Sequence, residues 1–439
     1  MLRTHYVSEL KTGDSKLETQ DSGHKTVTIA GWVHDIRDLG KLKFVLVRDK
    51  TGIMQVLLKK GLVTDELLES VKVNKEDVVL FEGQLKENKM APNGVELIPT
   101  RFELLNKVER KLPVDPTDVV PSELDTRLDY RYIDLRRKST SAIFSIKALI
   151  STAFREKLVE LGFTEVHTSC ITGAATEGGA DVFPIQYFEN LGFLVQSPQL
   201  YKQLAVIGGF DKVFITTPVF RAEKHNTTSH LNEIIQMDIE MGFADQNDAM
   251  DILEQVTLHI LKSINEKGKQ QLDALGVKHT APKKIPRYTY TELVEKLNKH
   301  GNKMKWGEDF SKDSEKQLSE ILNEELYFIY DWPTAIRAFY SMPKPGEEEK
   351  CNAFDLIYRG LEISSGAQRI HKVDILEDQL KKRGLDPVNF EFYLNAFRMG
   401  APPHAGWSIG LERLTMKICE QDNIRECTLF PRDRTRLHP

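Results

Sequence analysis

Phe220–Phe243, with the sequence FRAEKHNTTSHLNEIIQMDIEMGF, is the stretch that decides how the rest of the chain is interpreted. From Ile235 to Met241, apolar residues alternate with residues that carry side-chain oxygen acceptors, which predicts a strand with one apolar and one polar face. The polar face carries Gln236, Asp238 and Glu240. At the start of the stretch, Arg221 and Glu223 share one face of an extended strand. The pattern predicts a long hairpin with a polar loop, and a merely solvated polar face is the alternative interpretation.

Length and charge exclude some classes of protein. The chain has 439 residues, more than one ordinary core accommodates, so two or three domains are expected. Its 65 acidic and 60 basic residues give a net charge of −5. This excludes a general polycation but permits a local basic strip for nucleic acid.

Cysteines and apolar runs indicate the compartment. The four cysteines form no CxxC pair and no zinc spacing, which favours a reduced, intracellular protein. No apolar run reaches the length of a bilayer span, and the first twenty residues lack a signal-peptide core. We therefore expect a soluble, cytoplasmic protein with no membrane partner.

Residues 26–105 have the pattern of a small barrel. The expected strands are Thr26–His34, Phe44–Arg48, Met54–Leu58, Val78–Leu85 and Val95–Leu105, with a helix at Thr64–Val71. Five strands and one helix favour a Greek-key barrel of the OB type, although another small β-barrel is an open alternative. The face of an OB barrel binds oligonucleotides by stacking bases on exposed aromatics, for which Trp32, His34 and Phe44 are candidates. Each of these three fits a barrel core equally well.

The barrel is followed by an expected linker and then by two expected helices. Prolines mark residues 109–138 as an extended linker, and its basic run Thr126–Lys138 predicts a salt-bridged surface turn or a phosphate contact. A helix is expected at Ser141–Leu161, with Gly162 as its C-cap. Ser197 and Pro198 then predict the N-cap and first turn of a helix that carries Gln199 and Lys202 on one side.

The last third of the chain combines a helical segment with further strands. Residues 245–350 predict a helical insertion without evident chemistry; its helices are Asp248–Ile264, Tyr290–Leu297 and Ser314–Leu322, and a strand is expected at Leu326–Tyr330. A second hairpin is expected at Phe354–Tyr358 and Leu361–Arg369. The stretch Gly406–Leu414 predicts a glycine-spaced strand that enters a helix with Arg413 in its first turn, which suits a nucleotide phosphate or base.

The chain lacks the two commonest nucleotide-binding signatures, GxxxxGK[ST] and GxGxxG. It instead carries separated arginines and carboxylates on expected strands, namely Arg221, Glu223, Asp238, Glu362, Arg369 and Arg413. An ATP site on an antiparallel sheet needs such groups, with guanidinium groups on phosphate oxygens and carboxylates placed for Mg²⁺.

These pieces together resemble the class II aminoacyl-tRNA synthetases, and in particular the archaeal- and eukaryotic-type aspartyl-tRNA synthetases of class IIb. Three motifs match in order: a strand that ends near Ser169, then Phe220–Glu223, then Gly406–Arg413. The most specific matches are Thr176–Ala180, Gln196–Gln203 and Leu429–Arg434. The resemblance implies an α+β multidomain fold: an OB-fold anticodon-binding domain at 1–108, a hinge at 109–138, and a catalytic domain at 139–439 built on an antiparallel β-sheet flanked by helices, with the insertion at about 245–350.

The resemblance also implies an activity, the ATP-dependent attachment of L-aspartate to tRNA through an aspartyl-adenylate, with Mg²⁺ as cofactor. The implied catalytic residues are Arg221 on the α-phosphate, Glu223 and Arg413. His230 and Glu362 would also contact ATP, and Glu362 and Ser365 would hold the metal. The implied aspartate site consists of Arg369 and Lys202 on the side-chain carboxylate, Ser197, Gln199 and Asp238 on the α-amino group, Ser365, and Glu177 on a loop that closes over the substrate. Aspartate at position 238 favours the aspartyl over the asparaginyl enzymes, whose counterpart is typically glutamate.

In the barrel, the resemblance implies that Phe44 stacks on the central anticodon base while Gln55 and Glu96 read base edges, with Trp32 nearby. His34 and Pro92 stand where enzymes restricted to tRNA(Asp) carry a tryptophan and a lysine. This predicts charging of tRNA(Asn) as well, whose product a tRNA-dependent amidotransferase must then convert. A discriminating enzyme and a core-packed His34 are the alternatives.

Two departures from the family pattern affect particular expectations. A homodimer is expected, but Ser169 replaces the usual proline of the first motif. Ser408 replaces a usual glycine in the third motif, where we expect its side chain near the ATP floor. A catalytically inactive paralogue, an asparagine synthetase of the same fold, and an OB-fold binder with an unrelated partner domain are the rival classes. They are disfavoured because the barrel and the full set of site residues are present.

Overall fold

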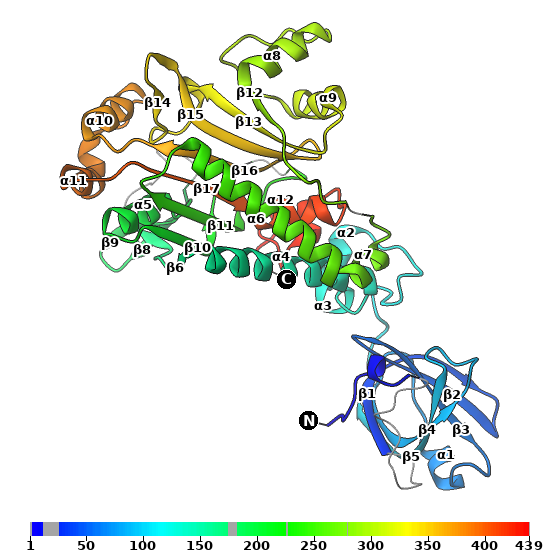
Figure 1. The fold of residues 1–439 in the computed structure, drawn as a ribbon. Helices are drawn as coiled ribbons and strands as arrows, with labels where there is room; N and C mark the ends of the chain where they lie inside the picture. The colour runs from blue at the N-terminus through cyan, green and yellow to red at the C-terminus, as the bar shows by residue number, and fades with distance from the viewer. Residues whose placement is uncertain (1, 12–25, 174–181, 225–226, 279, 439) are drawn as a thin grey trace. The chain divides into compact units, whose positions relative to one another are not determined.

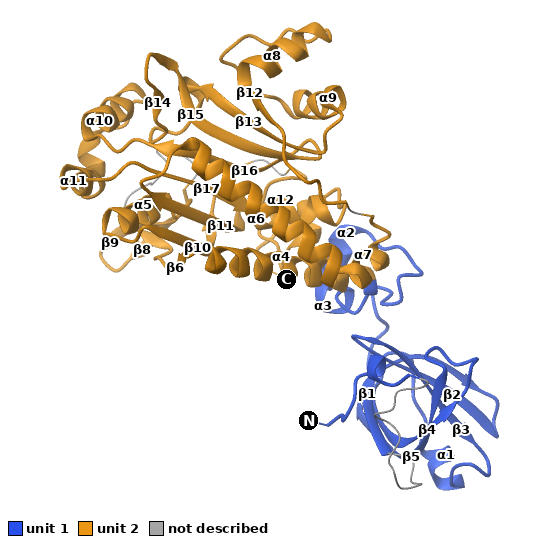
Figure 2. Ribbon diagram, in the orientation of Figure 1, with its two compact units in different colours: residues 1–138 blue, residues 139–439 orange. Residues whose placement is uncertain are grey.

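The computed structural model describes residues 2–11, 26–173, 182–224, 227–278 and 280–438. The chain divides into two compact units, Met1–Lys138 and Ser139–Pro439 (Figure 2). Within the described residues, no helix combines the length and the apolar character needed to cross a membrane.

The first unit contains a closed five-stranded barrel in the order β1-β2-β3-β5-β4. Its elements are β1 (Thr26–Asp38), β2 (Leu42–Asp49), β3 (Gly52–Lys59), α1 (Asp65–Ser70), β4 (Val78–Glu87) and β5 (Val95–Asn106). Side chains alternate in direction along each strand, and this determines which of them fill the barrel. In β2, Val45 and Val47 are buried in the core, whereas Phe44 and Arg48 point outward. The predicted OB-type barrel is confirmed.

Residues 109–138 of the first unit are not a simple extended linker. They contain α2 (Leu124–Asp129) and α3 (Arg131–Asp134). Arg131 and Asp134 are fully buried and their charged groups lie 2.6 Å apart, while Arg127 binds the same carboxylate at 2.8 Å. The predicted salt bridges are therefore present, but Arg131 and Asp134 form theirs in the interior rather than at the surface.

The second unit is built on a sheet in the order β12-β13-β15-β16-β17-β11-β10-β6. These strands are β6 (Thr164–Glu165), β10 (Lys212–Phe220), β11 (Glu233–Gly242), β12 (Arg287–Thr289), β13 (Leu326–Pro333), β15 (Glu347–Tyr358), β16 (Glu362–Arg369) and β17 (His404–Gly410), and the short β14 (Pro343–Lys344) pairs with β15. The pairs at the two ends, β12–β13 and β10–β6, are parallel, and the others are antiparallel. A mostly antiparallel sheet with flanking helices agrees with the predicted fold.

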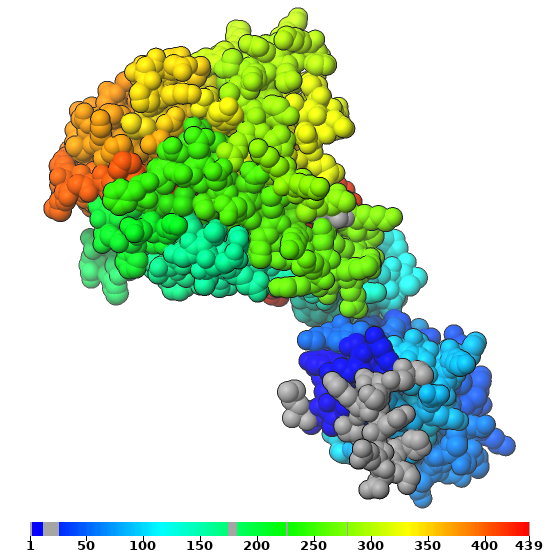
Figure 3. Space-filling model, viewed as in Figure 1, coloured from blue at the N-terminus to red at the C-terminus, as the bar shows by residue number. Residues whose placement is uncertain are grey.

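Helices cover the apolar face of this sheet. α6 (Gln246–Lys267) lies across it and packs on β15, β16 and β17 (Figure 1). In Figure 3 the green side chains around α6 cover the middle of the second unit on the side shown. α4 (Lys138–Glu160) and α12 (Leu411–Ile418) join the same core, and α4 is followed by Gly162 in the left-handed conformation. Further helices of this unit are α5 (Gln199–Ile207), α10 (Val373–Lys382) and α11 (Glu391–Arg398).

The predicted hairpin is formed by β10 and β11, paired from Lys212 with Met241 to Phe220 with Glu233. Met237 and Ile239 enter the core against α6. The opposite, polar face of β11 is nevertheless buried, since Gln236, Asp238 and Glu240 are at most 7% exposed. The alternative of a solvated polar face was therefore wrong, and these acceptors line the interior of the protein.

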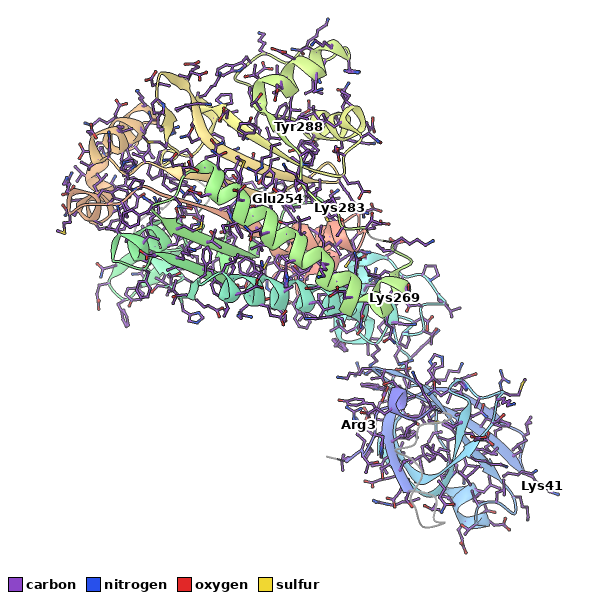
Figure 4. All side chains as sticks on the ribbon, in the orientation of Figure 1. Arg3, Lys41, Glu254, Lys269, Lys283 and Tyr288 are labelled. Carbon is purple, nitrogen blue, oxygen red and sulfur yellow. The ribbon has the colours of Figure 1, made fainter. Side chains whose placement is uncertain are left out.

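The segment predicted as a helical insertion contributes strands as well as helices, and β13 confirms the strand expected at Leu326–Tyr330. α7 (Lys269–Leu275), α8 (Tyr290–Lys299) and α9 (Lys312–Leu322) alternate with β12 and β13, which extend the central sheet. Glu254 of α6 accepts hydrogen bonds from the backbone of Ile285 and from Arg287 at the start of β12 (3.0 Å each). Figure 4 marks these two elements by Glu254 and Tyr288. Because the core sheet continues through it, the segment is part of the domain rather than an appendage.

Candidate active site

A row of polar side chains crosses four strands of the central sheet. Asp238 of β11 is opposite Ser408 of β17, Ser408 is opposite Ser365 of β16, and Ser365 is opposite Asp355 of β15. Residues directly opposite in antiparallel strands project from the same face. The neighbours of Ser408 along its own strand are buried in the core with α6, so the row projects from the other face.

A cavity of about 330 Å³ lies over this row. Most of the predicted site residues line it: Ser197, Gln199, Arg221, Glu223, His230, Asp238, Glu362, Ser365, Arg369 and Arg413. Glu177 lies outside the described residues. Lys202 is fully buried and does not line the cavity. Its amino group is directed to the buried carboxylates of Asp238 and Glu240.

One end of the cavity, called the deep end below, is formed by two buried ion pairs. The Lys202 amino group donates to Asp238 Oδ1 at 2.7 Å and lies 3.5 Å from Glu240. Arg369 Nε donates to Glu240 Oε1 at 3.0 Å. The resemblance assigned Lys202 and Asp238 to opposite ends of the amino acid, whereas the structure pairs them with each other. Glu240 was not predicted as a site residue, although the alternation of β11 already put it on the polar face.

The ion pairs keep the deep end charged despite its burial. Burial alone raises the pKa of Glu240, but Arg369 and Lys202 outweigh it and hold the pKa below its ordinary value. The pKa of Arg369 is raised, since its attraction to Glu240 exceeds the opposing effect of burial. Helix α5 supports the pairs from one side: Gln199 donates to Gln203 at 3.0 Å and reaches Glu240 at 3.4 Å. The site therefore offers a fixed pattern of charges.

The other end of the cavity, called the outer end below, is formed by the loop after β10 and by α12. β10 ends at Phe220, so Arg221 and Glu223, which were expected on the strand, lie just beyond it but still line the cavity. Asn232 holds this loop by donating to the backbone carbonyls of Arg221 (2.7 Å) and Glu223 (3.1 Å). Two side chains that carry opposite charge are thus presented from an irregular segment that has a fixed backbone.

Arg413 and His230 meet at the outer end. Arg413 Nη2 lies 3.1 Å from His230 Nε2, and Thr227 Oγ1 lies 2.7 Å from His230 Nδ1. A guanidinium can only donate, so Nε2 accepts and the ring proton is on Nδ1. Burial, followed by the charge of Arg413, lowers the pKa of His230. The imidazole is therefore neutral near pH 7 and orients Arg413, which also donates to the Glu362 carbonyl at 3.1 Å.

The predicted metal pair, Glu362 and Ser365, lies beside a cation of the protein. Arg337, which follows η3 (Thr334–Ile336), binds the Asp355 carboxylate and donates to Ser365 Oγ at 2.8 Å. Residues 245–350, in which no chemistry was evident from the sequence, thus place Arg337 at the cavity, because their helical periodicity gave no signal for an arginine in an irregular turn. Within the described residues, no group of three or more His, Cys, Asp or Glu side chains forms a ready metal site.

Three further residues at the cavity differ from expectation or were missed. Gln236 lines the cavity, and its buried side-chain oxygen has no hydrogen-bond partner among the described residues. Ser408, expected at the ATP floor, instead donates to Asp238 Oδ2 at 2.9 Å. Pro198 rather than Ser197 is the N-cap of α5, although Ser197 Oγ accepts from the Gln199 backbone at 3.3 Å. The polar face of β11 was the sequence signal for Gln236.

The outward face of the barrel brings the predicted base-reading residues onto adjacent strands. Gln55 of β3 is paired with Glu96 of β5 and donates to its carboxylate at 2.9 Å, while Asn88 donates at 2.8 Å. Phe44 projects from the same side of β2 as Arg48. Pro92 is exposed in the turn between β4 and β5. The Glu96 carboxylate is thus held by two amides, and the residue is only 4% exposed.

Trp32 and His34 of β1 are both engaged by arginines. Arg136 lies over the Trp32 ring at 5.0 Å and binds Glu76 at 3.0 Å. Arg48 Nη1 donates to His34 Nδ1 at 2.9 Å and binds Glu76 at 2.7 Å. His34 is therefore half-buried but not part of the barrel core. Burial and Arg48 lower its pKa, and because Arg48 must donate, the ring proton of neutral His34 is on Nε2.

Comparison with known proteins follows the division of the chain. Residues 123–434 match the model for class II tRNA synthetases (D, K and N), and residues 27–105 match the model for the OB-fold nucleic acid binding domain. The chain is 48% identical to the Aspartate--tRNA(Asp/Asn) ligase of Methanocaldococcus jannaschii, over 100% of this chain and 98% of that protein. It is 46% identical to the Aspartate--tRNA(Asp) ligase of Pyrococcus furiosus over the full length of both.

Solved structures give the same family with two amino-acid specificities. The asparaginyl-tRNA synthetase of Pyrococcus horikoshii, complexed with asparaginyl-adenylate, matches with a TM-score of 0.91 and 32% identity, and each chain is covered completely. The aspartyl-tRNA synthetase of Entamoeba histolytica matches with a TM-score of 0.85 and 32% identity, over 99% of this chain and 93% of that one. With an OB-fold barrel followed by a polar cavity on a mostly antiparallel sheet, the chain belongs to the class II aminoacyl-tRNA synthetases of the D, K and N group.

Proposed function

We propose that this enzyme attaches L-aspartate to tRNA(Asp) and to tRNA(Asn), with ATP, through an aspartyl-adenylate. The observation that carries the choice of amino acid is the deep end, where Arg369 is buried beside the cavity and Lys202 lies just beneath it. The proposal is also supported by relatives of full length that are 46% to 49% identical and are named Aspartate--tRNA(Asp/Asn) ligases.

The chemistry of Arg369 favours a carboxylate over an amide. A guanidinium carries five donors and no acceptor, and its fork matches a carboxylate in a bidentate geometry. The side chain of asparagine would present an amide NH₂ to those donors, and a donor facing a donor in a buried site leaves both unpaired. Asp238 and Gln199, with side-chain acceptors at the cavity, suit the α-ammonium group. We infer that aspartate binds with its side chain towards Arg369 and its ammonium towards Asp238.

Adenylate formation then needs positioning and charge neutralisation rather than an acid or a base. The α-carboxylate of aspartate attacks the α-phosphorus in line, and pyrophosphate leaves. Arg221 stabilises charge at the α-phosphate, and Arg413, oriented by neutral His230, binds the base or the γ-phosphate. Glu223 lines the cavity on the same side. These groups come from a fixed loop and a helix start, so little of them must reorganise during the reaction.

Mg²⁺ would be held by Glu362 and Ser365 together with phosphate oxygens and water. Their oxygen donors are the type that this ion prefers, and Asp355 supplies a further carboxylate across the strand pair. When bound, the ion would neutralise charge on the phosphate oxygens. Arg337 binds Asp355 and Ser365 and holds their side chains in place.

The breadth of tRNA recognition depends on His34. The third anticodon base is cytosine in tRNA(Asp) and uracil in tRNA(Asn), and both bases carry a carbonyl at C2. Because Arg48 occupies Nδ1, neutral His34 presents a single N–H donor at Nε2, which such a shared carbonyl accepts equally in both. Pro92 offers no side-chain donor that would distinguish the two bases. We propose that this arrangement admits both tRNAs.

The decisive experiment is aminoacylation with labelled aspartate or labelled asparagine, using purified tRNA(Asp) and tRNA(Asn) side by side. Aspartate charging of both tRNAs is expected, and asparagine charging of either would overturn the choice of amino acid. Charging of tRNA(Asp) alone would leave an aspartyl enzyme but overturn the role of His34. In that assay His34→Trp is expected to reduce tRNA(Asn) charging more than tRNA(Asp) charging, and Pro92→Lys to act in the same direction.

Two partners follow from this proposal. Aspartate on tRNA(Asn) is a mischarged product, so a tRNA-dependent amidotransferase must convert it to asparagine. We also propose a homodimer, with Ser169 near the subunit contact, which light scattering on the purified enzyme measures directly. A monomer at micromolar concentration would contradict this part of the proposal without affecting the chemistry of the site.

A further inference from the structure

Ser408 occupies the middle of the polar row, and its hydroxyl is used for one contact. Its Oγ donates to Asp238 Oδ2 at 2.9 Å. Its other cross-strand neighbour is Ser365, whose hydroxyl accepts from Arg337 at 2.8 Å. The serine hydroxyl is therefore directed to the carboxylate of β11 and not to the outer end of the cavity.

Asp238 is fixed through both of its oxygens. Oδ1 accepts from the Lys202 amino group at 2.7 Å and Oδ2 accepts from Ser408. The carboxylate is 1% exposed, so water does not compete for these positions. A carboxylate has about four acceptor positions, so two fixed donors orient its plane and leave the others for a ligand. Lys202 is held in turn by Glu240 and the Trp407 carbonyl, which prevents it from turning away.

We propose that Ser408 is a positioning residue for the amino-acid substrate, which acts by orienting Asp238 towards the α-ammonium group. This inference rests on the role proposed above for Asp238. Without the hydroxyl, Lys202 would be the only side chain in the described part of the chain that holds the carboxylate, which is then free to rotate towards the lysine and away from the ligand. Hydrogen bonds to charged groups contribute enough for such a loss to weaken aspartate binding by about tenfold.

The test uses Ser408→Ala, Ser408→Thr and Asp238→Asn in the full-length enzyme. ATP–pyrophosphate exchange gives the KM for aspartate, the KM for ATP and kcat, and succinate serves as an inhibitor because it is aspartate without the ammonium group. For Ser408→Ala, we expect the KM for aspartate to rise about tenfold while the KM for ATP and the inhibition constant of succinate stay within about twofold. Ser408→Thr retains a hydroxyl and should recover most of the affinity for aspartate.

The outcomes separate this inference from the proposed function. A rise in the KM for ATP alone would return Ser408 to the ATP floor and overturn the inference. Equal weakening of aspartate and succinate would indicate a general distortion of the cavity and would also overturn it. If Asp238→Asn raises the KM for aspartate and Ser408→Ala does not, the role of Ser408 fails while that of Asp238 stands. If neither variant changes the KM for aspartate, the proposed role of Asp238 itself fails.

Discussion

The two ends of the cavity carry similar charged side chains but differ in how far these are buried and paired. At the deep end, Lys202, Asp238, Glu240 and Arg369 are at most 4% exposed and are already paired with one another. At the outer end, the side chains of Arg413 and Glu362 are 25% and 38% exposed and lie 3.7 Å apart. The deep end thus has its charges fixed in advance, whereas the outer end keeps them partly in water.

This difference indicates which end of the cavity can select the amino-acid substrate. A buried, pre-paired network accepts a ligand only if the ligand's own charges complete the pattern, because an unpaired charge there has no water to compensate it. Partly hydrated arginines attract any polyphosphate, and their contribution depends on positioning and is reduced by salt. We therefore expect amino-acid selectivity and local stability to depend on the deep end, and catalytic rate to depend on the outer end.

The strongest test of this comparison is Arg369→Leu at the deep end. It removes a cation proposed for the aspartate side chain and takes from the buried Glu240 its arginine partner, leaving it with Lys202 at 3.5 Å, which Asp238 also shares. Breaking a buried ion pair in this way costs about 3–5 kcal/mol of stability, and aspartate-dependent pyrophosphate exchange should fall by roughly a thousandfold or more. Urea denaturation and the exchange assay measure the two effects separately.

The control is the double variant Arg369→Leu with Glu240→Gln. Glu240→Gln removes the buried carboxylate that lost its arginine partner, so most of the lost stability should return. Activity should remain low, because the cation for the substrate is still absent. Recovery of activity together with stability would show that Arg369 supports the fold and does not contact aspartate, and the comparison between the two ends would fail.

Arg221→Ala tests the outer end and should have the opposite profile. Arg221 forms no ion pair within the part of the chain that the structure describes, so its removal should leave the free energy of unfolding nearly unchanged. Losing a donor at the charge that develops on the α-phosphate should reduce kcat by about a hundred- to a thousandfold. Single-turnover measurement of adenylate formation separates this step from tRNA charging.

Arg221→Lys is the matched variant for this prediction. It keeps the positive charge but not the planar fork, so it should recover only part of the lost rate. Full activity in Arg221→Lys would show that charge alone suffices at this position. A large loss of stability in either variant would contradict the division between a pre-paired deep end and an adaptable outer end.

Most of the site residues that were predicted from the sequence line the cavity, but the ion pairs among the site residues could not be predicted. The strict alternation from Gln236 to Glu240 identified the polar face of β11, since side-chain direction along a strand follows from local geometry alone. The contact of Lys202 with Asp238 joins a helix to a strand 36 positions away in the chain. Such a pairing depends on how α5 docks on the sheet, for which a single sequence has no local signal.

The same limit explains the errors in the segment 245–350. The amphipathic period predicted helices there, but β12 is only three residues long and offers almost no alternation. Arg337 lies in an irregular turn, and its importance becomes visible only when β15 and β16 bring Asp355 and Ser365 to it. The barrel was easier to predict, because closely spaced strands with turn residues form a regular and local pattern.

A pH-dependent prediction concerns Glu315 of α9, near the outer end. Its burial, followed by the nearby carboxylates of Glu362, Asp355 and Asp309, raises its pKa to about 8, although Arg413 acts in the opposite direction. The unfolded chain loses this proton near the ordinary value, whereas the folded chain keeps it to about pH 8. Between these values the folded state binds more protons, so the contribution of Glu315 to stability falls as the pH rises.

Glu315→Gln removes this titration and should gain stability relative to the parent as the pH rises from 5 to 8, by on the order of 2 kcal/mol at the upper end. Urea denaturation at several pH values measures the gain. Glu320→Gln, a change at an exposed position of the same helix, is the control and should show no such trend. A difference between Glu315→Gln and the parent that is constant with pH would mean that Glu315 is already ionised in the folded enzyme at neutral pH.

The smallest effect is expected for Lys312→Ala, also on α9. The Lys312 amino group donates to Ser229 Oγ at 2.8 Å, and Ser229 lines the cavity. An exposed cation at this position should help to hold the phosphates of ATP, so its removal should raise the KM for ATP by about two- to fivefold without changing the KM for aspartate. The effect should shrink at high salt, because the charge is exposed. Lys316→Ala, one turn further along the helix, is the matched control and should leave both constants unchanged. If Lys312→Ala also leaves the KM for ATP unchanged at low salt, Lys312 supports the loop of Ser229 but does not contribute to ATP binding. Arg413 and Arg221 would then remain the cations proposed for ATP at the outer end.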